Sequence, residues 1–554
     1  MKVGLVETMD QLQAYKNVWC DVYQRDPESQ FYLSWWWLTD FLSRSDEDWV
    51  VLTAAPEETS QPVAFLPLRV KLKRRKKSGI FVNGFIMAGN YAADYTGLLC
   101  LPEFEDEAIP AFARHLKTMA WAFLNLDYLR MSEKRKGLFL GEFPKKTFGF
   151  KSLPSVNKKD NVNNLICPYV DLPDSFDAYL AEKLSANSRQ KLRRLLRKVD
   201  AGDDYRITHA DADSIDRDIE TLLKFWEAQW ASRKGEYLKK ILSNNRILLR
   251  SGFELGHLYM PVLWKGDQPH GVLGSFLDHE KKAVLFMISG RDPSFNEIPS
   301  GLLLHAHSIR HAIETGFRTY DFLRGNEPYK YSFGCQERAI ERITVSTKSG
   351  VNLGGRLAAR TVPLVFKQVL LLHKKRYRDE AEIGYRQILE TAPRHAGALY
   401  GLAQLLAARQ EDAEAAQLFE TLTALQPANL KAWLRLAQVY QRSSGAEAAC
   451  GAYRKVLAID PKLISAHFGL AKCLAEMDRP SEAVDVLQAI MRLPPRNEAE
   501  RTVAVEATKL LSVLKPGLVF THPLVQSIAA PGQTPFVVPG ETGDVNVVLK
   551  PSEK

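Results

Sequence analysis

Four prolines lie 34 residues apart near the C-terminal end of the chain. Each follows an alanine by 12 residues and a large apolar residue by 8. The prolines are Pro393, Pro427, Pro461 and Pro495, the alanines Ala381, Ala415, Ala449 and Ala483, and the large residues Tyr385, Phe419, Tyr453 and Leu487. A proline ends a helix because it lacks an N–H and restricts the residue before it. Since small alanines let two helices approach closely, this period predicts a stack of helical hairpins.

The phased residues resemble the tetratricopeptide repeat. The resemblance covers residues 362–495, with three full repeats after a more apolar and basic first one, VPLVFKQVLLLHKKRY. We therefore expect an all-α solenoid over residues 360–500. Because such solenoids usually bind peptides on their concave face, we also expect a protein partner. A structural spacer and a self-association surface are the alternatives. Over residues 515–554, Pro, Gly and Thr interrupt every period, which predicts a flexible tail.

Composition limits the class of protein. The chain has 554 residues, 45% hydrophobic and 25% charged, which is typical of a soluble globular protein with several domains. Six scattered cysteines with no CxxC pair argue against a disulfide framework and a zinc ribbon. The N-terminus has no signal-peptide pattern, and no apolar run reaches the ~18–20 residues of a membrane span. We therefore expect a cytoplasmic protein.

Residues 1–350 pass twice through a cycle of helical and strand-like periods. In the first cycle the helical stretches TMDQLQAYKNVWCDVYQRD and SWWWLTDFL precede the strand-like runs WVVLTAA and PVAFLPLRVKLKRR. The second cycle begins near Ile166 with helices, among them DIETLLKFWEAQWASRKG, in which Trp226 and Trp230 are assigned to the inward face. A meander over HLYMPVLW, HGVLGSFLD and AVLFMIS follows, then a helix and the strand RTYDFL. The pattern predicts two α/β halves, residues 1–165 and 166–350.

The second cycle resembles a known family. GVLGSF and SGRDPSFNEIPSGLLLHAHSIRHAIETGFRTYDFLRGNEPYKYSFG are similar to the acetyltransferase domain of CelD/BcsL-type proteins, a bacterial GNAT subgroup linked to exopolysaccharide synthesis. In the first half, LPLRVKLKRRKK and MAGNYAADYTGLL match as well, so the resemblance covers about residues 5–345. At longer range the chain is similar to Fem-type aminoacyltransferases, which pair two GNAT-like halves. The resemblance implies a double GNAT-like body (α/β, α+β) and acyl transfer with acetyl-CoA as the expected donor.

The expected donor site lies where the strand AVLFMIS gives way to a helix. Gly290 and Arg291 end that strand, where a bend would expose backbone to the acyl arm. Ser300, Gly301 and Leu302 open the helix, whose N-terminus offers unpaired N–H groups to a pyrophosphate. Ser300 is expected to cap the helix, and Gly301 to let the backbone approach a phosphate. The usual GNAT phosphate signature is absent, and an ordinary capped helix is the alternative.

The expected acceptor site is YDFLRGNEPYKYSFG, residues 320–334. Acyl transfer from a thioester needs a base for the acceptor's amine or hydroxyl and an acid for the leaving thiolate. Glu327 or Asp321 is the candidate base, and Tyr329 or Tyr331 is the candidate acid. The alternative is a surface hairpin in which the charges pair with each other.

Four further residues are candidates for contacts to the substrate. Arg324 and Lys330 suit a carboxylate or a phosphate. Asp94 and Tyr95 belong to the stretch MAGNYAADYTGLL, and the resemblance implies that they line a cleft between the halves. A turn that closes a hairpin is the alternative for this pair.

Two other features concern partners and metals. The basic runs 69–77 and 189–198 suit an anionic glycan, a nucleotide-sugar or a lipid headgroup, which leaves peripheral membrane contact open. No recognised motif supports nucleic acid as the partner, and solvated helix or strand faces are the alternative. His307, His311 and Glu314 have a spacing that metal ligands can adopt, yet they lie off the apolar stripe of their helix. No metal site is predicted.

These patterns together predict an acyltransferase that acts on an amine or hydroxyl of a sugar or polysaccharide precursor, or of a protein, while its repeats dock onto a partner. Two alternatives remain. One is a Fem-type transferase that uses aminoacyl-tRNA, in which the basic runs carry the RNA. The other is a non-catalytic scaffold with a degenerate transferase body.

Overall fold

The computed structural model describes residues 1–45, 48–89, 93–202, 204–349, 352, 357–443 and 445–516, with the backbone of two short strands at 536–539 and 545–548. The chain divides into two compact units. The first comprises residues 1–71 and 83–355, and the second comprises residues 72–82 with the chain from residue 356 onward.

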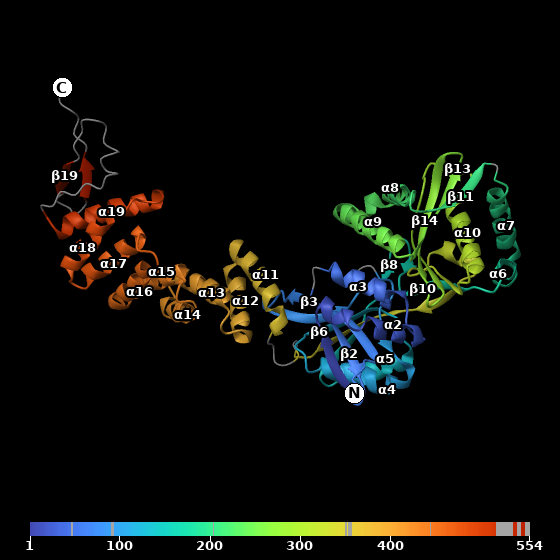
Figure 1. The fold of residues 1–554 in the computed structure, drawn as a ribbon, viewed down its shortest axis with the longest axis horizontal. Coiled ribbons are helices and arrows are strands. Elements are labelled where there is room, and N and C mark those ends of the chain that lie inside the picture. Colours follow the sequence, from blue (N-terminus) through green and yellow to red (C-terminus); the bar gives the residue numbers. More distant parts are fainter. Residues whose placement is uncertain are drawn as a thin grey trace, which may run out of the picture. The chain divides into compact units, whose positions relative to one another are not determined.

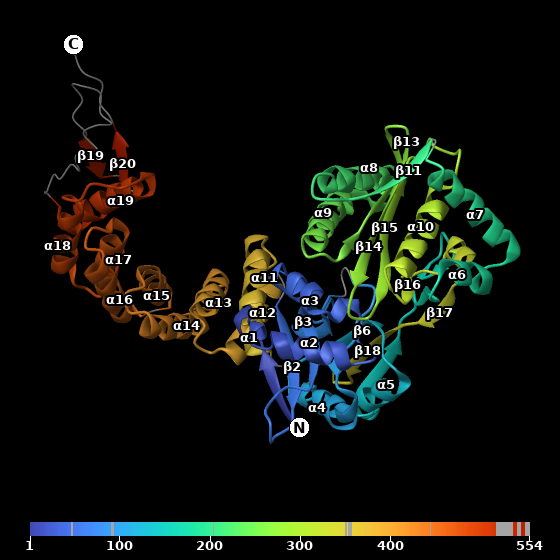
Figure 2. The ribbon, with the colours of Figure 1, turned by 45° about the vertical axis from the view of Figure 1, so that its right-hand side comes forward.

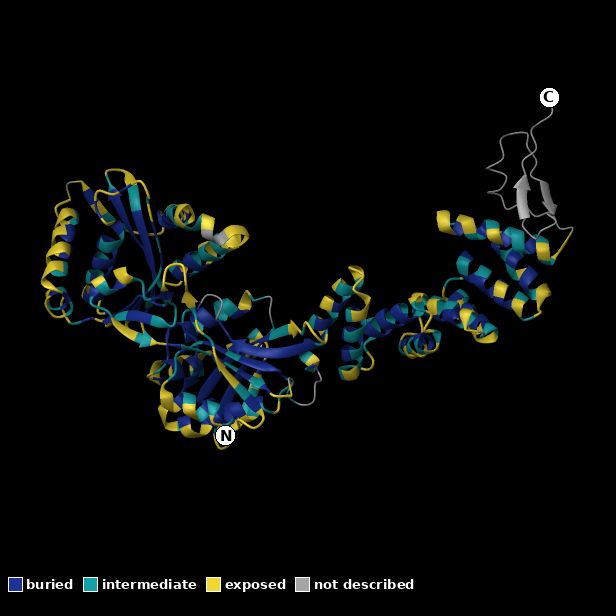
Figure 3. Cartoon of the chain, turned by 180° about the vertical axis from the view of Figure 1, so that it is seen from behind, coloured by how far each residue is buried: buried dark blue, intermediate teal, exposed yellow. Residues whose placement is uncertain are grey.

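The first half of the first unit is a strand and three helices followed by a strand meander. Its elements are β1 (Lys2–Val6), α1 (Met9–Gln13), α2 (Lys16–Arg25), α3 (Trp35–Ser43), β2 (Trp49–Ala55), β3 (Ala64–Arg74), β4 (Phe81–Met87), β5 (Leu99–Cys100), α4 (Glu105–Leu116), β6 (Phe123–Leu129), α5 (Glu133–Leu140) and β7 (Phe148–Ser152). Strand β2 is buried along its length because helices cover both faces of the sheet (Figure 3). Val50 and Leu52 pack with α4, and Val51 packs with α1–α3.

The second half of the first unit has the same kind of layers (Figure 2). Its elements are β10 (Ile166–Asp171), α6 (Phe176–Lys183), α7 (Ala186–Asp200), β11 (Tyr205–His209), α8 (Ile215–Lys234), α9 (Leu238–Glu254), β12 (Leu258–Tyr259), β13 (Pro261–Lys265), β14 (Gln268–Asp278), β15 (Ala283–Arg291), α10 (Ser300–Glu314), β16 (Thr319–Asp321), the 3₁₀ helix η4 (Pro328–Phe333) and β17 (Gln336–Ala339). Helices α6, α7 and α10 share one core with this sheet, and α8 and α9 share another.

The two halves repeat one topology. In each, an antiparallel meander (β2–β3–β4 or β13–β14–β15) leads through a helix (α4 or α10) to a strand parallel to the last one, β6 beside β4 and β16 beside β15. The predicted mixed α/β double body is therefore confirmed. The sheet orders are β1-β2-β3-β4-β6-β18-β7 and β11-β13-β14-β15-β16-β10-β17. Strand β18 (Glu341–Thr347), which we did not predict from the sequence, follows the second half and pairs with β6 and β7 of the first.

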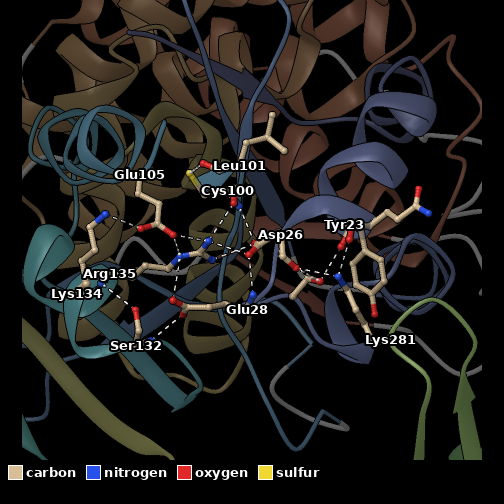
Figure 4. Close-up of polar contacts among 12 residues, drawn as sticks. Tyr23, Asp26, Glu28, Cys100, Leu101, Glu105, Ser132, Lys134, Arg135 and Lys281 are labelled. Atoms are coloured by element: carbon tan, nitrogen blue, oxygen red, sulfur yellow. Dashed lines mark hydrogen bonds and ion pairs between the residues drawn. The ribbon is translucent and has the colours of Figure 1, made fainter. Parts of the chain in front are cut away.

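A buried ion network holds the first half together (Figure 4). The guanidinium of Arg135, on α5, is fully buried. Asp26 accepts hydrogen bonds from its two terminal nitrogens at 3.0 and 2.8 Å, and Glu105 accepts from Nε at 2.9 Å. The carbonyl of Cys100 accepts a further bond at 3.0 Å. The end of α2, strand β5, helix α4 and helix α5 therefore all meet at this cation.

We expect Arg135→Met to lower the free energy of unfolding of the first unit by ~3–5 kcal/mol, because Asp26 would stay buried without its counter-ion, while Glu105 would keep only Lys134. Urea unfolding followed by tryptophan fluorescence measures this, since nine of the ten tryptophans lie in the first unit. The control is Arg25→Met, which removes an exposed guanidinium paired with Asp21 and Glu103 and should cost less than ~1 kcal/mol. An equally small loss for Arg135→Met would contradict the importance of the network.

The helices of the second unit form the predicted all-α solenoid (Figure 1). Its helices are α11 (Val362–Lys374), α12 (Arg378–Thr391), α13 (Ala396–Ala408), α14 (Asp412–Leu425), α15 (Leu430–Arg442), α16 (Ala446–Ile459), α17 (Ile464–Glu476), α18 (Pro480–Ile490) and α19 (Glu498–Leu514). The phased alanines and large apolar residues are all buried. The ring of Tyr385 lies where a Cβ on Gly401 would be only 2.3 Å away, so neighbouring helices pack closely.

The outer end of the β3–β4 hairpin, residues 72–82, completes the core of the first repeat. Phe81 is buried with residues of α11 and α12. Its N–H donates to Gln387 Oε1 at 2.7 Å, and its carbonyl accepts from Gln387 Nε2 at 3.1 Å. Arg74 pairs with Glu380 at 3.8 Å. A strand end from early in the sequence thus belongs to the repeat unit, which the repeat period did not predict.

The predicted flexible tail, residues 515–554, lies largely outside the described residues. Within it, β19 (Phe536–Pro539) and β20 (Val545–Val548) pair as antiparallel strands. In the described part of the chain, no helix combines the length and the apolar character needed to cross a bilayer.

Candidate active site

A cleft of about 840 Å³ opens in the first unit where β15 and β16 part. The two strands pair only over Ala283–Leu285 and Thr319–Asp321. Beyond Leu285, β15 continues along the cleft wall as Phe286–Arg291, while the chain after β16 lines another wall with residues between Phe322 and Phe333. The side of β15 that faced β16 therefore carries backbone groups without a strand partner, open to the cleft.

Strand β15 is bent inside the cleft. Ser275 of β14 lies opposite Phe286 and Gly274 lies opposite Ile288, so Met287 is an extra residue, a β-bulge. The predicted bend is thus present, but it lies three residues before Gly290. A Cβ on Gly290 would come within 2.7 Å of the backbone carbonyl oxygen of Leu222, so this glycine serves the close approach of α8.

The N-terminus of α10 lines the cleft beside this bend. Pro299, Ser300, Gly301 and Leu302 all belong to the lining. The prediction that Ser300 caps the helix is wrong, because Pro299 occupies the cap position and makes no side-chain cap. A Cβ on Gly301 would meet no atom within 4 Å, so open space adjoins the first turn. Arg291 lines the cleft at the end of β15, and Lys191 of α7 lines it as well.

Lys330 organises the loop that follows β16. Its ammonium is buried and donates to three carbonyls, those of Phe322, Arg324 and Gly325, at 2.9, 3.0 and 2.9 Å. All three of its N–H groups are thereby used. This geometry gives Lys330 a structural role in place of the predicted contact to substrate, because no N–H is left for a ligand. The loop also holds Leu323 at φ 56°, a strained conformation for a residue with a side chain.

Glu327 lies next to that ammonium and lines the cleft. Its Oε2 is buried and forms an ion pair with Lys330 Nζ at 3.0 Å. Tyr329 also lines the cleft and is 46% exposed; partial burial, reinforced by the Glu327 carboxylate, raises the pKa of its hydroxyl. The predicted base and acid are thus brought to one wall.

Arg324 and Asp94 form an ion pair at the cleft. Asp94 accepts a hydrogen bond from Nε of the Arg324 guanidinium, which lies over the ring of Tyr128 at 3.8 Å. Burial alone would lower the pKa of Arg324, but the Asp94 carboxylate raises it overall. Both residues line the cleft.

Three predicted site residues lie outside the cleft lining. Asp321 is buried and accepts from Tyr95 Oη at 2.9 Å, from Arg338 Nη1 at 3.0 Å and from the Leu323 N–H at 2.8 Å. Every contact is internal, so the geometry gives Asp321 and Tyr95 structural roles in place of proton transfer and substrate contact. Tyr331 donates to Glu337 outside the cleft.

Sequence reasoning passed over His305, a cleft residue of α10. Its imidazole is packed among aromatic rings, with Nδ1 3.0 Å from Tyr320 Oη. Burial, with the nearby Lys330 ammonium, lowers the pKa of His305 to about 3, so the ring is neutral at pH 7. The sequence signal for this residue was a histidine placed on the apolar stripe of the helix predicted to bind the acyl donor.

Trp226 and Trp230, which the helical period assigned to the inward face, line the cleft, and Trp226 also packs against the core shared by α8 and α9. They lie one turn apart on α8, with ring centroids 6.3 Å apart. The apolar stripe of α8 is fully buried as far as Leu223 and only partly buried at the two tryptophans. The sequence signal for these cleft residues was a pair of tryptophans at the end of the apolar stripe of α8.

His307 and His311 lie away from the cleft and pack on His209 and Tyr259. The Nε2 atoms of His209 and His307 are 3.1 Å apart, and the Tyr259 ring stacks on His311 at 4.3 Å. Glu314 is exposed. Among the described residues, no three His, Cys, Asp or Glu side chains are arranged to hold a metal ion.

We expect the first unit to lose stability as the pH falls from about 6.5 towards 3. The pKa of His305 and of His307 is lowered to about 3 by burial, so in this range the unfolded chain binds protons that the folded chain does not. Replacing His305 by Gln should reduce the pH-dependent loss of unfolding free energy by up to ~1.4 kcal/mol per pH unit between pH 6 and 5. Exposed His279→Gln is the control, and an unchanged slope in His305→Gln would refute the assignment.

Two family models match parts of the chain. One, described as an acetyltransferase (GNAT) domain, matches residues 186–331, and the other, described as a protein kinase G tetratricopeptide repeat, matches residues 398–512. No curated protein matches the chain.

Several solved structures are similar in part. FemX has 9% identity and a TM-score of 0.44, over 62% of this chain and 96% of its own. MamA from Desulfovibrio magneticus RS-1 has 21% identity and a TM-score of 0.23, over 24% of this chain and 75% of its own. YrrB, described as a TPR protein with an unusual peptide-binding site, has 19% identity and a TM-score of 0.23, over 30% of this chain and 89% of its own.

The matched residues 186–331 include α7, the bent strand β15, the first turn of α10 and the loop that carries Glu327 and Tyr329. The chain therefore carries a GNAT-type acetyltransferase domain in its second α/β half, followed by a tetratricopeptide repeat region that supports binding of a protein partner.

Proposed function

We propose that the cleft transfers an acyl group from acetyl-coenzyme A to an amine or hydroxyl acceptor, as CelD/BcsL-type acetyltransferases are expected to do. The observation that carries the proposal is the parting of β15 and β16 after Leu285. It leaves the backbone of a bulged strand and the first turn of α10 facing one cavity. A strand edge suits the amide-containing arm of a coenzyme A thioester, and a helix N-terminus suits its diphosphate.

The donor side is built from α10, β15 and α7. The N–H groups of Ser300, Gly301 and Leu302 lie in the first helical turn, where they have no partner within the helix. Arg291 and Lys191 add two cations to the cleft lining. The space at Gly301 leaves room for a phosphate close to the backbone. The bound thioester would supply the activated acyl group.

The acceptor side is built from the loop after β16. Glu327 is the proposed base, because its side chain lines the cleft and is 37% exposed, while the Lys330 ammonium holds its buried Oε2. It would take the proton of the attacking amine or hydroxyl. Tyr329, whose pKa is raised, keeps its proton at neutral pH and is the proposed donor to the leaving sulfur.

A sugar precursor is the acceptor that the remaining lining fits best. Trp226 and Trp230 offer flat apolar faces, and the amides of Gln229, Asn157 and Asn164 line the same cleft. Aromatic faces suit the C–H groups of a pyranose ring, while amides donate to and accept from its hydroxyls. The tetratricopeptide region would dock this transferase onto a protein partner. We propose that the transferase acts in the cytoplasm.

Gly301→Glu should weaken the binding of acetyl-coenzyme A at least about tenfold, because a carboxylate at the helix N-terminus would repel the diphosphate. Isothermal titration calorimetry measures the affinity. The matched control is Gly301→Ala, which fits the open space and should leave the affinity unchanged within about twofold. Equal affinities for the two variants would remove the first turn of α10 from the site.

Glu327→Gln should lower kcat by about 10²–10⁴-fold while leaving the affinity for acetyl-coenzyme A unchanged. The assay follows release of the coenzyme A thiol in the presence of amino sugars or peptides as acceptors. The control is Glu337→Gln, which changes a carboxylate that accepts from Tyr331 outside the cleft. Full activity of Glu327→Gln with every acceptor that the wild type uses would exclude Glu327 as the base.

A further inference from the structure

Two short segments of the second unit hold more than the whole net charge of the chain. Residues 72–82 and 362–378 contain ten Lys and Arg and no Asp or Glu. Since the formal net charge of the chain is +9, all its other residues together carry −1. This concentration of charge is not part of the cleft, because none of these residues lines it.

The two segments meet in space. Residues 72–82 are the outer end of the β3–β4 hairpin, and residues 374–378 form the end of α11 and the turn into α12. Arg74 pairs with Glu380 in the first turn of α12, and a Cβ on Gly79 would lie 3.0 Å from the Ile383 side chain. The hairpin therefore lies along α12, beside the turn that carries the second set of cations. We call these residues the basic surface.

Most cations of the basic surface are not neutralised by the protein. Lys76, Lys77, Lys374, Lys375, Arg376 and Arg378 are exposed and pair with no carboxylate of the described residues. The neighbouring acids are already engaged, since Glu380 pairs with Arg74 and Asp379 pairs with Arg409. Unpaired like charges repel one another, so a surface of this kind is stabilised by an anionic partner.

Apolar side chains lie among these cations. Leu371 and Tyr377 are 51% and 52% exposed, in a chain whose large hydrophobic residues are mostly buried. They bracket Lys374–Arg376, at the end of a helix that begins VPLVFKQVLLL. The phosphate backbone of a nucleic acid offers a leucine side chain no favourable contact. At a lipid bilayer, an apolar side chain can enter the acyl-chain boundary while a cation stays at the headgroups.

From this combination we propose that the basic surface docks the protein on an anionic lipid bilayer. Lys and Arg would contact the lipid phosphates, while Leu371 and Tyr377 enter the interface. The docking is peripheral and reversible. It brings the transferase to acceptors held at a membrane, yet it does not depend on the proposed reaction.

The test is co-sedimentation of the full chain with vesicles of phosphatidylcholine, with and without phosphatidylglycerol. We expect binding only to the vesicles that contain phosphatidylglycerol, and loss of that binding when salt rises from about 0.1 M to 0.5 M. Leu371→Ser should weaken it several-fold without a change in net charge. Binding that ignores phosphatidylglycerol or salt would overturn the proposal.

Charge-reversed variants test the location. We expect two double variants each to lower vesicle binding at least about tenfold. They are Lys374→Glu/Lys375→Glu, at the end of α11, and Lys76→Glu/Lys77→Glu, which lies outside any helix. The matched control is Arg194→Glu/Arg197→Glu on α7, which changes the net charge by the same amount in the other basic run. An equal loss in the control would show a general charge effect and refute the basic surface. Retention of RNA with no binding to vesicles would make nucleic acid the partner and also refute it.

Discussion

Asp321 is the residue on which the arrangement of the first unit depends. It ends β16 at the point where β15 and β16 part, and its carboxylate is buried. Tyr95 brings the first half to it, Arg338 brings β17, and the Leu323 N–H brings the loop that lines the cleft. A buried carboxylate must be paired and hydrogen-bonded, and these donors satisfy that demand. The same bonds that neutralise Asp321 therefore join the halves and open the cleft.

Much of the fold was predictable because its signals are local. A 34-residue period and the alternation of helices with meanders follow from residues close together in the sequence, and both predictions are confirmed. The errors concern partners that are distant in sequence. Strand β18 pairs with β6 more than 200 residues earlier, and the end of the β3–β4 hairpin enters the core of the first repeat. The hydrophobic period of a segment does not indicate which distant surface that segment will pack against.

For the site, the order of strand, helix and loop predicted where the cleft lies, but not what each charged residue does there. Lys330 and Asp321 are residue types that often bind ligands. In this structure, however, their hydrogen-bonding groups are used by the protein itself. This could not be read from sequence, because it follows from a loop in which Leu323 adopts a left-handed conformation and three carbonyls converge. Trp226 packs against the core as the helical period predicts, but it and Trp230 also line the cleft, which a period alone does not indicate.

The geometry of Lys330 also separates Glu327 from the other acids of the cleft. Asp94 accepts hydrogen bonds from Arg324, so its lone pairs are engaged. Glu327 has a cation 3.0 Å from Oε2, but the three N–H groups of that cation are directed at carbonyls. The ammonium thus offsets the cost of a carboxylate in a half-buried loop and holds it in place. A Cβ on Gly325 would lie 2.6 Å from Oε2, so this glycine keeps the space that the carboxylate occupies. Because Oε2 is buried against the ammonium, the other oxygen, Oε1, is the one left to take the proton of an acceptor.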